Sequence, residues 1–246
     1  LGGLCAWPSR QTSVWSDRSR RPKAACSNKA ILMGEHVAVI DYGMGNLRSV
    51  AKALEHVGDA DTRIRVTSDP AVVRSACRVV FPGQGAMGDC MGALARFDLL
   101  DAIAESQRDR PFLGICIGFQ ALFDASEEDG GTPALGLVPG QVQRFENGQH
   151  DPDTGARVKV PHMGWNNVVQ TREHPLWDGI DDGAHFYFVH SYHVQPADWK
   201  VSTGNCDYGV PFCAAAAGDG WFGTQFHPEK SAVDGLRLLH NFLRWN

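Results

Sequence analysis

The 246-residue chain is 43% hydrophobic and 21% charged and has a net charge of −5 at pH 7, which argues against nucleic acid or an anionic membrane as its main partner. No apolar run reaches the roughly 18 residues that cross a bilayer, and the seven cysteines, which include no Cys-x-x-Cys pair, suit neither a disulfide framework nor a structural zinc site. We therefore expect a cytoplasmic enzyme with reduced thiols that acts on a small molecule and holds no metal and no cofactor.

The N-terminal residues differ in composition from the rest of the chain. Residues 1–33 have no amphipathic period, and they set one acid, Asp17, against Arg10, Arg18, Arg20, Arg21, Lys23 and Lys29. Met33 is a candidate start of translation, and an organelle transit peptide is the alternative interpretation of an Arg-rich, Ser-rich segment. We expect residues 1–35 to be a disordered or artefactual extension and residues 36–246 to form the catalytic domain.

The next part of the chain alternates apolar strand patterns with amphipathic helix patterns, which is typical of α/β folds. Strands are predicted at residues 36–42, 63–67, 78–81 and 112–115, with helices between them. We expect an open, mostly parallel sheet with helices on both faces. Ligands of such sheets bind at the carboxyl ends of the strands.

Two glycine-rich turns follow predicted strands and raise the question of a dinucleotide site. The first, Gly43-x-Gly45, has Arg48 where the fingerprint needs a third glycine. The second, at residues 83–88, matches the spacing but lacks an acid at the end of a following strand. We interpret residues 83–85 as a loop whose backbone amides approach a substrate or a developing oxyanion closely.

A sharp turn between a strand and a helix is predicted at Cys116, because Gly114 and Gly118 flank it and relieve crowding at the apex. Amide dipoles at the start of the following helix favour a thiolate there. The alternative is that Cys116 is a small buried hydrophobe, as most cysteines are. We take Cys116 as the candidate nucleophile.

From residue 135 the pattern changes to short strands separated by turn signals such as Asn147-Gly148. We expect a β-rich second half with antiparallel pairs and a closing helix. The predicted strands are at residues 141–145, 157–160, 167–169, 185–189, 212–217 and 221–226, and the helix spans residues 233–243.

His227-Pro228-Glu229 directly follows the last predicted strand. A thiol nucleophile needs a base and an orienting partner for that base. Residues i and i+2 of an extended segment point the same way, so His227 and Glu229 can supply both. An isolated motif of this kind is more often a surface turn, but a cysteine elbow and this segment can meet at the carboxyl edge of the sheet.

The stretch from Gly114 to Gln120, together with His227-Pro228-Glu229, resembles the class I, or triad, glutamine amidotransferases. Within that family the similarity over residues 36–246 is to the glutaminase subunits of imidazole glycerol phosphate synthases. It is carried by residues 41–46, 159–166, 186–192 and 225–231. Gln84 and Phe119 depart from the family pattern, which has a small apolar residue and a methionine there.

The resemblance implies a flavodoxin-like α/β fold that hydrolyses glutamine to glutamate and ammonia. Cys116 would attack the carboxamide, His227 would protonate the departing ammonia, and Glu229 would orient the imidazole. The oxyanion hole would come from backbone amides at Gly83, Gln84, Gly85 and Ile117. The ends of the bound glutamine would be held by Gln120, Ser191 and Tyr192.

The resemblance also implies a partner, a (β/α)8 cyclase subunit that receives the ammonia in a heterodimer. The complex would produce imidazole glycerol phosphate and aminoimidazole carboxamide ribotide in histidine biosynthesis. The docking face would include Asn46, Pro161, His162, Trp165 and Lys230.

Three alternatives stay open at this point. The same triad serves other acceptors in the anthranilate, guanylate and carbamoyl phosphate systems. The chain could instead be a catalytically silent binding subunit, or a thiol hydrolase that works without a partner.

Overall fold

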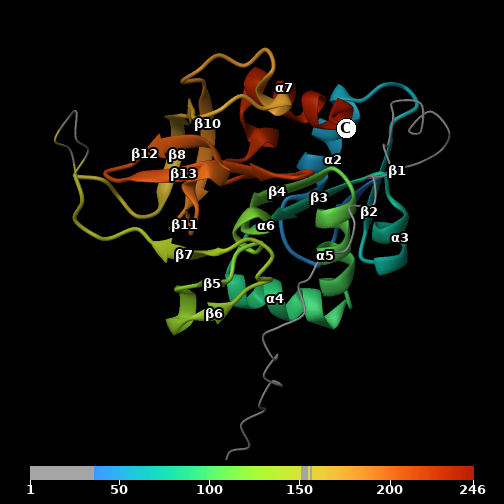
Figure 1. The fold of residues 1–246 in the computed structure, drawn as a ribbon, viewed down its shortest axis with the longest axis horizontal. Coiled ribbons are helices and arrows are strands. Elements are labelled where there is room, and N and C mark those ends of the chain that lie inside the picture. The colour runs from blue at the N-terminus through green and yellow to red at the C-terminus, as the bar shows by residue number, and fades with distance from the viewer. Residues whose placement is uncertain (1–35, 151–154, 156) are drawn as a thin grey trace, which may run out of the picture.

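The computed structural model describes residues 36–150, 155 and 157–246, so the predicted N-terminal extension lies outside the described residues (Figure 1). The first half alternates strands and helices, as the sequence predicts. Its strands are β1 (His36–Ile40), β2 (Arg63–Thr67), β3 (Arg78–Gly83) and β4 (Phe112–Cys116), and its helices are α2 (Leu47–Val57), α3 (Pro70–Ser75), α4 (Met87–Arg96), α5 (Leu100–Asp109) and α6 (Ile117–Gln120).

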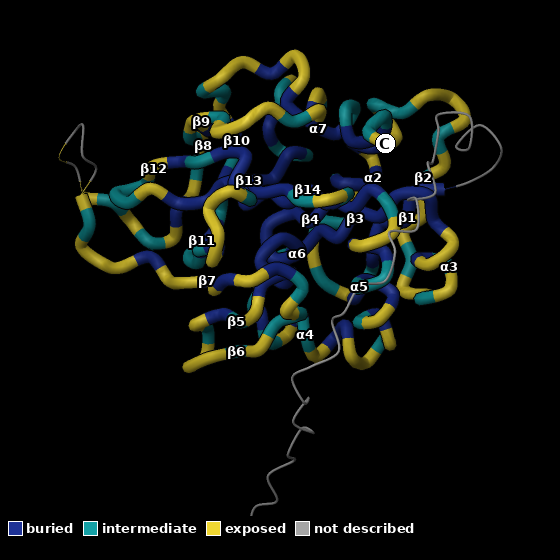
Figure 2. The backbone as a smooth tube through the Cα atoms, in the orientation of Figure 1, coloured by how far each residue is buried: buried dark blue, intermediate teal, exposed yellow. Residues whose placement is uncertain are grey.

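Five strands pair in parallel in the order β2-β1-β3-β4-β14, where β14 is Trp221–Thr224. Every residue of β1, β3, β4 and β14 is buried (Figure 2), as expected for strands that are covered on both faces. At the edge of the sheet, β2 is half-exposed and has Arg63 and Arg65 along it. Charged residues on an edge strand discourage pairing with other chains.

Helices cover both faces of this parallel sheet. α2 packs against α7 (Ala232–Arg244), and α3 packs against α5 on the other face (Figure 1). α3 begins at Pro70, and the side chain of Asp69 accepts a hydrogen bond of 2.8 Å from Ala71 N, which caps the helix. Within the described ranges, no helix is long and apolar enough to span a bilayer.

The second half is rich in short strands. They are β5 (Ala125–Ser126), β6 (Thr132–Pro133), β7 (Gly140–Arg144), β8 (His162–Asn167), β9 (Val169–Gln170), β10 (His185–His190), β11 (Tyr192–Pro196), β12 (Ser202–Asp207) and β13 (Pro211–Gly218). The one-turn 3-10 helices are η1 (Glu128–Gly130), η2 (Pro175–Trp177), η3 (Trp199–Val201) and η4 (Pro228–Lys230).

The second half extends the main sheet from β14 through antiparallel pairs to β13, β11 and β7. β8 and β10 pair with each other in a separate antiparallel sheet, in which His162 lies opposite His190. The prediction of an α/β fold with a parallel first half and an antiparallel second half is confirmed.

Several predicted boundaries are wrong. The strand predicted at residues 157–160 is a single bridge at Arg157, and the strand forms instead at β8. The apolar spacing of Leu94, Phe97, Leu100 and Ile103 predicts one helical run before β4, but it forms two helices, because Asp98 takes a left-handed φ of 57° between α4 and α5. The helix after the elbow is predicted to run through Ala121, Leu122 and Phe123, but α6 ends at Gln120.

Candidate active site

Cys116 stands at the apex of a strand-to-helix elbow. It is the last residue of β4 and has φ 54° and ψ −110°, a strained backbone conformation for any residue but glycine. A Cβ atom on Gly118 would lie 1.8 Å from the carbonyl oxygen of Phe81, and one on Gly114 would lie 2.8 Å from the carbonyl oxygen of Gly118. Only glycine fits at these two positions, so the sequence dictates the turn that presents the thiol.

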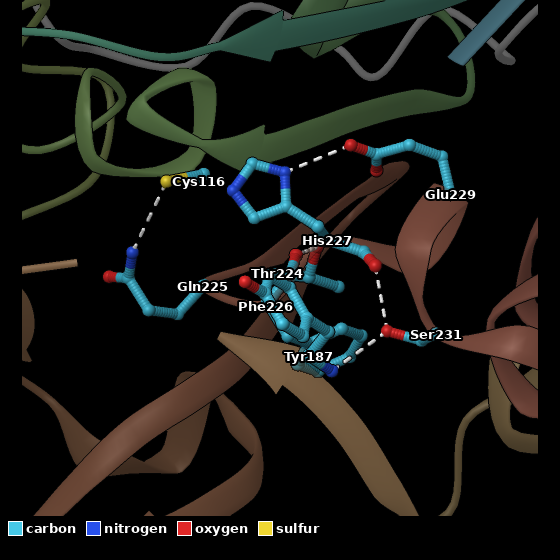
Figure 3. A network of polar contacts seen from close by, with 8 residues as sticks. All are labelled: Cys116, Tyr187, Thr224, Gln225, Phe226, His227, Glu229 and Ser231. Atoms are coloured by element: carbon cyan, nitrogen blue, oxygen red, sulfur yellow. Dashed lines mark hydrogen bonds and ion pairs between the residues drawn. The ribbon is translucent and has the colours of Figure 1, made fainter. Parts of the chain in front are cut away.

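His227 reaches the elbow because β14 is the neighbour of β4 in the sheet, with Thr224 paired to Ile115. Its backbone is held from both sides: His227 N donates to the Tyr187 carbonyl at 2.9 Å, and the Ser231 hydroxyl donates to the His227 carbonyl at 2.7 Å. Tyr187 N in turn donates to the Ser231 hydroxyl oxygen at 3.0 Å (Figure 3). The loop after β14 is therefore fixed to β10.

The imidazole of His227 lies between the thiol of Cys116 and the carboxylate of Glu229 (Figure 3). Its Nδ1 lies 2.9 Å from Glu229 Oε1, and both side chains are buried. Burial disfavours the imidazolium, but the Cys116 thiolate and the Glu229 carboxylate outweigh this cost and raise the pKa of His227 to about 9. At neutral pH the geometry therefore supports an imidazolium at His227.

A cavity of about 510 Å³ opens over this thiol. Ten predicted site residues line it: Gln84, Gly85, Cys116, Ile117, Gln120, Pro161, Ser191, Tyr192, His227 and Lys230. Ile117 is the first residue of α6, so its amide has no carbonyl partner within that helix. Gly85 has φ +100°, which suits a loop that brings its backbone close to a ligand.

Five predicted site residues do not line the cavity. Glu229 lies behind His227, and Gly83 ends β3 opposite Cys116. Asn46 precedes α2, in the turn where Gly45 approaches the backbone of Gly83. Trp165 is 53% exposed, on β8.

His162 is the fifth of these residues, and its side chain is buried rather than exposed on a docking face. It stacks against the rings of Phe188 and Tyr208, with ring centroids 4.7 Å and 3.9 Å away.

The sequence analysis assigned no role to Tyr187, Val189 and His190, which line the cavity, or to Gln225 and Glu128. Gln225 is buried, and its Nε2 lies 3.8 Å from Cys116 Sγ; its spacing of two residues from His227 was a usable signal, since i and i+2 share a face in extended chain. Glu128 lines the cavity, and its carboxylate accepts a 2.6 Å hydrogen bond from Met87 N at the start of α4. In the sequence Glu128 stands in the acidic run Glu127-Glu128-Asp129, which gives no sign of a ligand site.

The described residues contain no cluster of three or more His, Cys, Asp or Glu side chains that could bind a metal ion. Cys90, Cys116, Cys206 and Cys213 are free thiols. Burial raises the pKa of Cys213 to about 12, which makes that thiol inert.

Comparison with known proteins places this geometry in a family. Residues 38–245 match the model of the family "Glutamine amidotransferase class-I". The chain is 58% identical over 214 residues to imidazole glycerol phosphate synthase subunit HisH of Dechloromonas aromatica, covering 87% of this chain and 98% of that protein. It is 54% identical to subunit HisH 1 of Pseudomonas aeruginosa, covering 87% of this chain and 99% of that protein.

Solved structures agree on the fold. A crystal structure of a glutamine amidotransferase superposes with a TM-score of 0.62 at 16% identity, covering 84% of this chain and 96% of that one. The glutaminase domain of Trypanosoma brucei CTPS with bound acivicin gives 0.57 at 14% identity, covering 86% and 95%. From the family match and the identity to these relatives, the chain belongs to the class I glutamine amidotransferases.

Proposed function

We propose that the chain is the glutamine-hydrolysing subunit of an imidazole glycerol phosphate synthase, and that residues 36–246 form its glutaminase domain. The observation that carries this is the line of Cys116, His227 and Glu229 beneath a cavity of about 510 Å³. The names of the relatives supply the synthase, and the family resemblance implies that it serves histidine biosynthesis.

The reaction begins with the thiolate of Cys116, which attacks the carboxamide carbon of glutamine. The carbonyl oxygen becomes an oxyanion, which backbone amides at Ile117 and in the loop from Gly83 to Gly85 stabilise. One such donor is typically worth about 3 kcal/mol of barrier. The C–N bond then breaks, the nitrogen takes the proton of His227 Nε2, and ammonia leaves a glutamyl thioester on Cys116.

Hydrolysis of the thioester reverses the role of His227. The imidazole, now neutral, takes a proton from water as the water attacks the thioester carbonyl, and the thiolate leaves. Glu229 accepts from Nδ1 throughout, so the other nitrogen always faces the reacting atoms. The thiolate and imidazolium are restored when glutamate departs.

Glutamine has an ammonium group and a carboxylate that the cavity must recognise. Gln120, Ser191 and Tyr192 line the cavity, and we assign them to the two ends of the substrate. Glu128 adds the acidic group of this lining. A partly buried carboxylate attracts a cation, so we assign Glu128 to the ammonium group.

An exposed surface borders the mouth of the cavity, and we assign it to the cyclase subunit. On β8, Met163 is 63% exposed and Trp165 is 53% exposed. Trp165 packs edge-on against Tyr187 on β10, and the Lys230 ammonium lies 5.8 Å from the Tyr187 ring centroid. Large exposed apolar side chains beside a charged rim are typical of protein interfaces. We call this surface, made of Pro161, Met163, Trp165, Tyr187 and Lys230, the β8–β10 face.

Pro161, Tyr187 and Lys230 of this face also line the cavity. Ammonia released at Cys116 would therefore leave toward the cyclase, whose reaction consumes it. The free cysteines suit a reducing compartment, and we assign the complex to the cytoplasm.

The test is glutamate release from glutamine by the purified chain mixed with its cyclase subunit. The proposal predicts release that requires Cys116, and release that rises when the cyclase and its nucleotide ligand are added. Release that survives Cys116→Ala would contradict the assigned chemistry. Recovery of a different synthase from cell extract would contradict the assigned partner.

A further inference from the structure

Four buried polar side chains connect the wall of the cavity to the β8–β10 sheet, and the steps above assign none of them to the thiolate. They are Gln225, Gln120, His190 and His162, each no more than 6% exposed. Buried polar groups are costly unless they are hydrogen-bonded. The bonds that these residues make form one continuous chain that ends at the nucleophile.

The orientation of Gln225 is fixed by Gln120. Gln120 Nε2 donates to the Tyr192 carbonyl at 2.8 Å and to Gln225 Oε1 at 3.0 Å. The opposite orientation of Gln120 would set its own oxygen against that carbonyl, so the network excludes it. Gln225 must therefore present its oxygen to Gln120 and its Nε2 to Cys116 Sγ, 3.8 Å away (Figure 3).

The same carbonyl fixes the tautomers of two histidines. His190 Nδ1 lies 2.8 Å from the Tyr192 carbonyl oxygen and donates to it, so His190 Nε2 is an acceptor. His162 Nδ1 lies 3.0 Å from His190 Nε2 and donates a hydrogen bond to it. The remaining nitrogen of His162 faces Asn166 Nδ2 at 3.4 Å, and Asn166 also donates to the Asp207 carbonyl at 2.9 Å.

Both imidazoles are neutral at pH 7, as this pattern of one donor and one acceptor on each ring requires. Burial lowers the pKa of His162 to about 4 and takes that of His190 well below its ordinary value. The stacked rings of Phe188 and Tyr208 hold His162 in place. His162, the end of this hydrogen-bond network farthest from Cys116, lies on β8. The same strand carries Met163 and Trp165 of the β8–β10 face.

We propose that the Gln225 amide donates to the Cys116 thiolate, and that Gln120, His190 and His162 are positioning residues that fix this amide and connect the β8–β10 face to the nucleophile. The proposal rests on the proposed function, in which Cys116 is the nucleophile. It goes beyond the triad, because it assigns part of the thiolate's stability to residues outside the triad.

The first test measures alkylation of Cys116 by iodoacetamide as a function of pH, read from the mass of the Cys116 peptide. Gln225→Met keeps the length of the side chain and removes the donor. Hydrogen bonds to charged groups typically give about a tenfold effect, so we expect the alkylation rate at neutral pH to fall about tenfold and the profile to move to higher pH. Gln141→Met, on the exposed side of β7, is the matched control and should behave as wild type.

Gln225→Glu is the second variant, in case the first does not fold. It keeps the acceptor for Gln120 and puts a carboxylate beside the sulfur, so its profile should move further to higher pH than that of Gln225→Met. A folded variant of either kind with the wild-type rate and profile would overturn the proposal. Thermal unfolding establishes which variants are folded.

The second test asks whether the outer end of the chain acts through Gln225. His162→Phe keeps the stacked ring and removes both nitrogens. Coupling through such a network predicts a fall of about threefold in the alkylation rate, and no further fall when His162→Phe is combined with Gln225→Met. The connection between His162 and Gln225 would be overturned if the two substitutions lowered the alkylation rate by factors that multiply in the double variant. A folded His162→Phe with the wild-type alkylation rate would also overturn it.

Alkylation uses no glutamine, so it separates this inference from the proposed function. If the wild-type complex releases no glutamate while the Gln225 variants still change alkylation, the function is wrong and the inference stands. If glutamate is released and alkylation does not depend on Gln225, only the inference is wrong.

Discussion

The protonation of His162 makes the stability of the fold depend on pH. Burial lowers its pKa to about 4 in the folded chain, whereas an unfolded histidine titrates at about 6.5. As the pH falls, His162 binds a proton in the unfolded chain before it does so in the folded chain. The stability that the neutral imidazole contributes is therefore present above about pH 6.5 and is lost as the pH falls toward 4. One such group gives a slope of up to about 1.4 kcal/mol per pH unit, or roughly 2 kcal/mol between pH 7 and pH 5.

The assay is urea unfolding of the wild type and His162→Phe at both pH values. At neutral pH we expect the variant to be less stable by about 1–3 kcal/mol, because His190 Nε2 loses its donor. On acidification the wild type should lose roughly 2 kcal/mol more than the variant does. His56→Phe, a change at an exposed position of α2, is the control and should keep the wild-type pH dependence.

An equal loss of stability in the wild type and His162→Phe on acidification would refute this reasoning. It would mean that His162 is protonated in the folded protein. The hydrogen bonds that require neutral His162 and His190 could not then form as described.

Three further predictions follow from the site. Glu229→Gln should leave the fold intact but lower glutamate release by at least about 100-fold, because the amide carries no negative charge and can present its N–H to His227 Nδ1, so that the tautomer is no longer selected; steady-state kinetics with the cyclase measure this. Gly118→Ala should lower both activity and the unfolding temperature, since its Cβ would stand 1.8 Å from the Phe81 carbonyl oxygen; calorimetry and the same kinetic assay would show whether only one of them changes. Trp165→Ala should keep the unfolding temperature and weaken binding of the cyclase by about 2 kcal/mol, as a large exposed aromatic at an interface does; titration calorimetry with unchanged affinity would remove Trp165 from the interface.

The parallel sheet and the elbow were predictable because their signals are local. Apolar runs between turn residues indicate buried strands. The glycines at 114 and 118 indicate a sharp turn at Cys116, because no other residue fits at those two positions. The proximity of His227 to Cys116 needed one further rule, that parallel strands end at one edge of the sheet. β14 satisfies it by pairing with β4.

Other features depended on contacts between distant segments and were not predictable from local pattern. The family resemblance placed His162 on a docking face, but side chains alternate along a strand, and on β8 that of His162 is turned inward while those of Met163 and Trp165 are exposed. Nothing in the local sequence indicates that Gln225 donates to the sulfur of Cys116. The orientation of its amide is set by Gln120, which is far away in sequence. The break at Asp98 requires a left-handed residue inside a helical pattern, which periodicity cannot reveal.

The central claim is that Cys116, oriented toward His227, hydrolyses glutamine in a complex with a cyclase subunit. The most direct measurement is the rate of glutamate release by wild type and Cys116→Ala, each with and without the cyclase and its nucleotide ligand. We predict release by the wild type that the complete complex increases, and background release by the variant in every condition. Glutamate release by Cys116→Ala at the wild-type rate, or none from the complete wild-type complex, would contradict the claim.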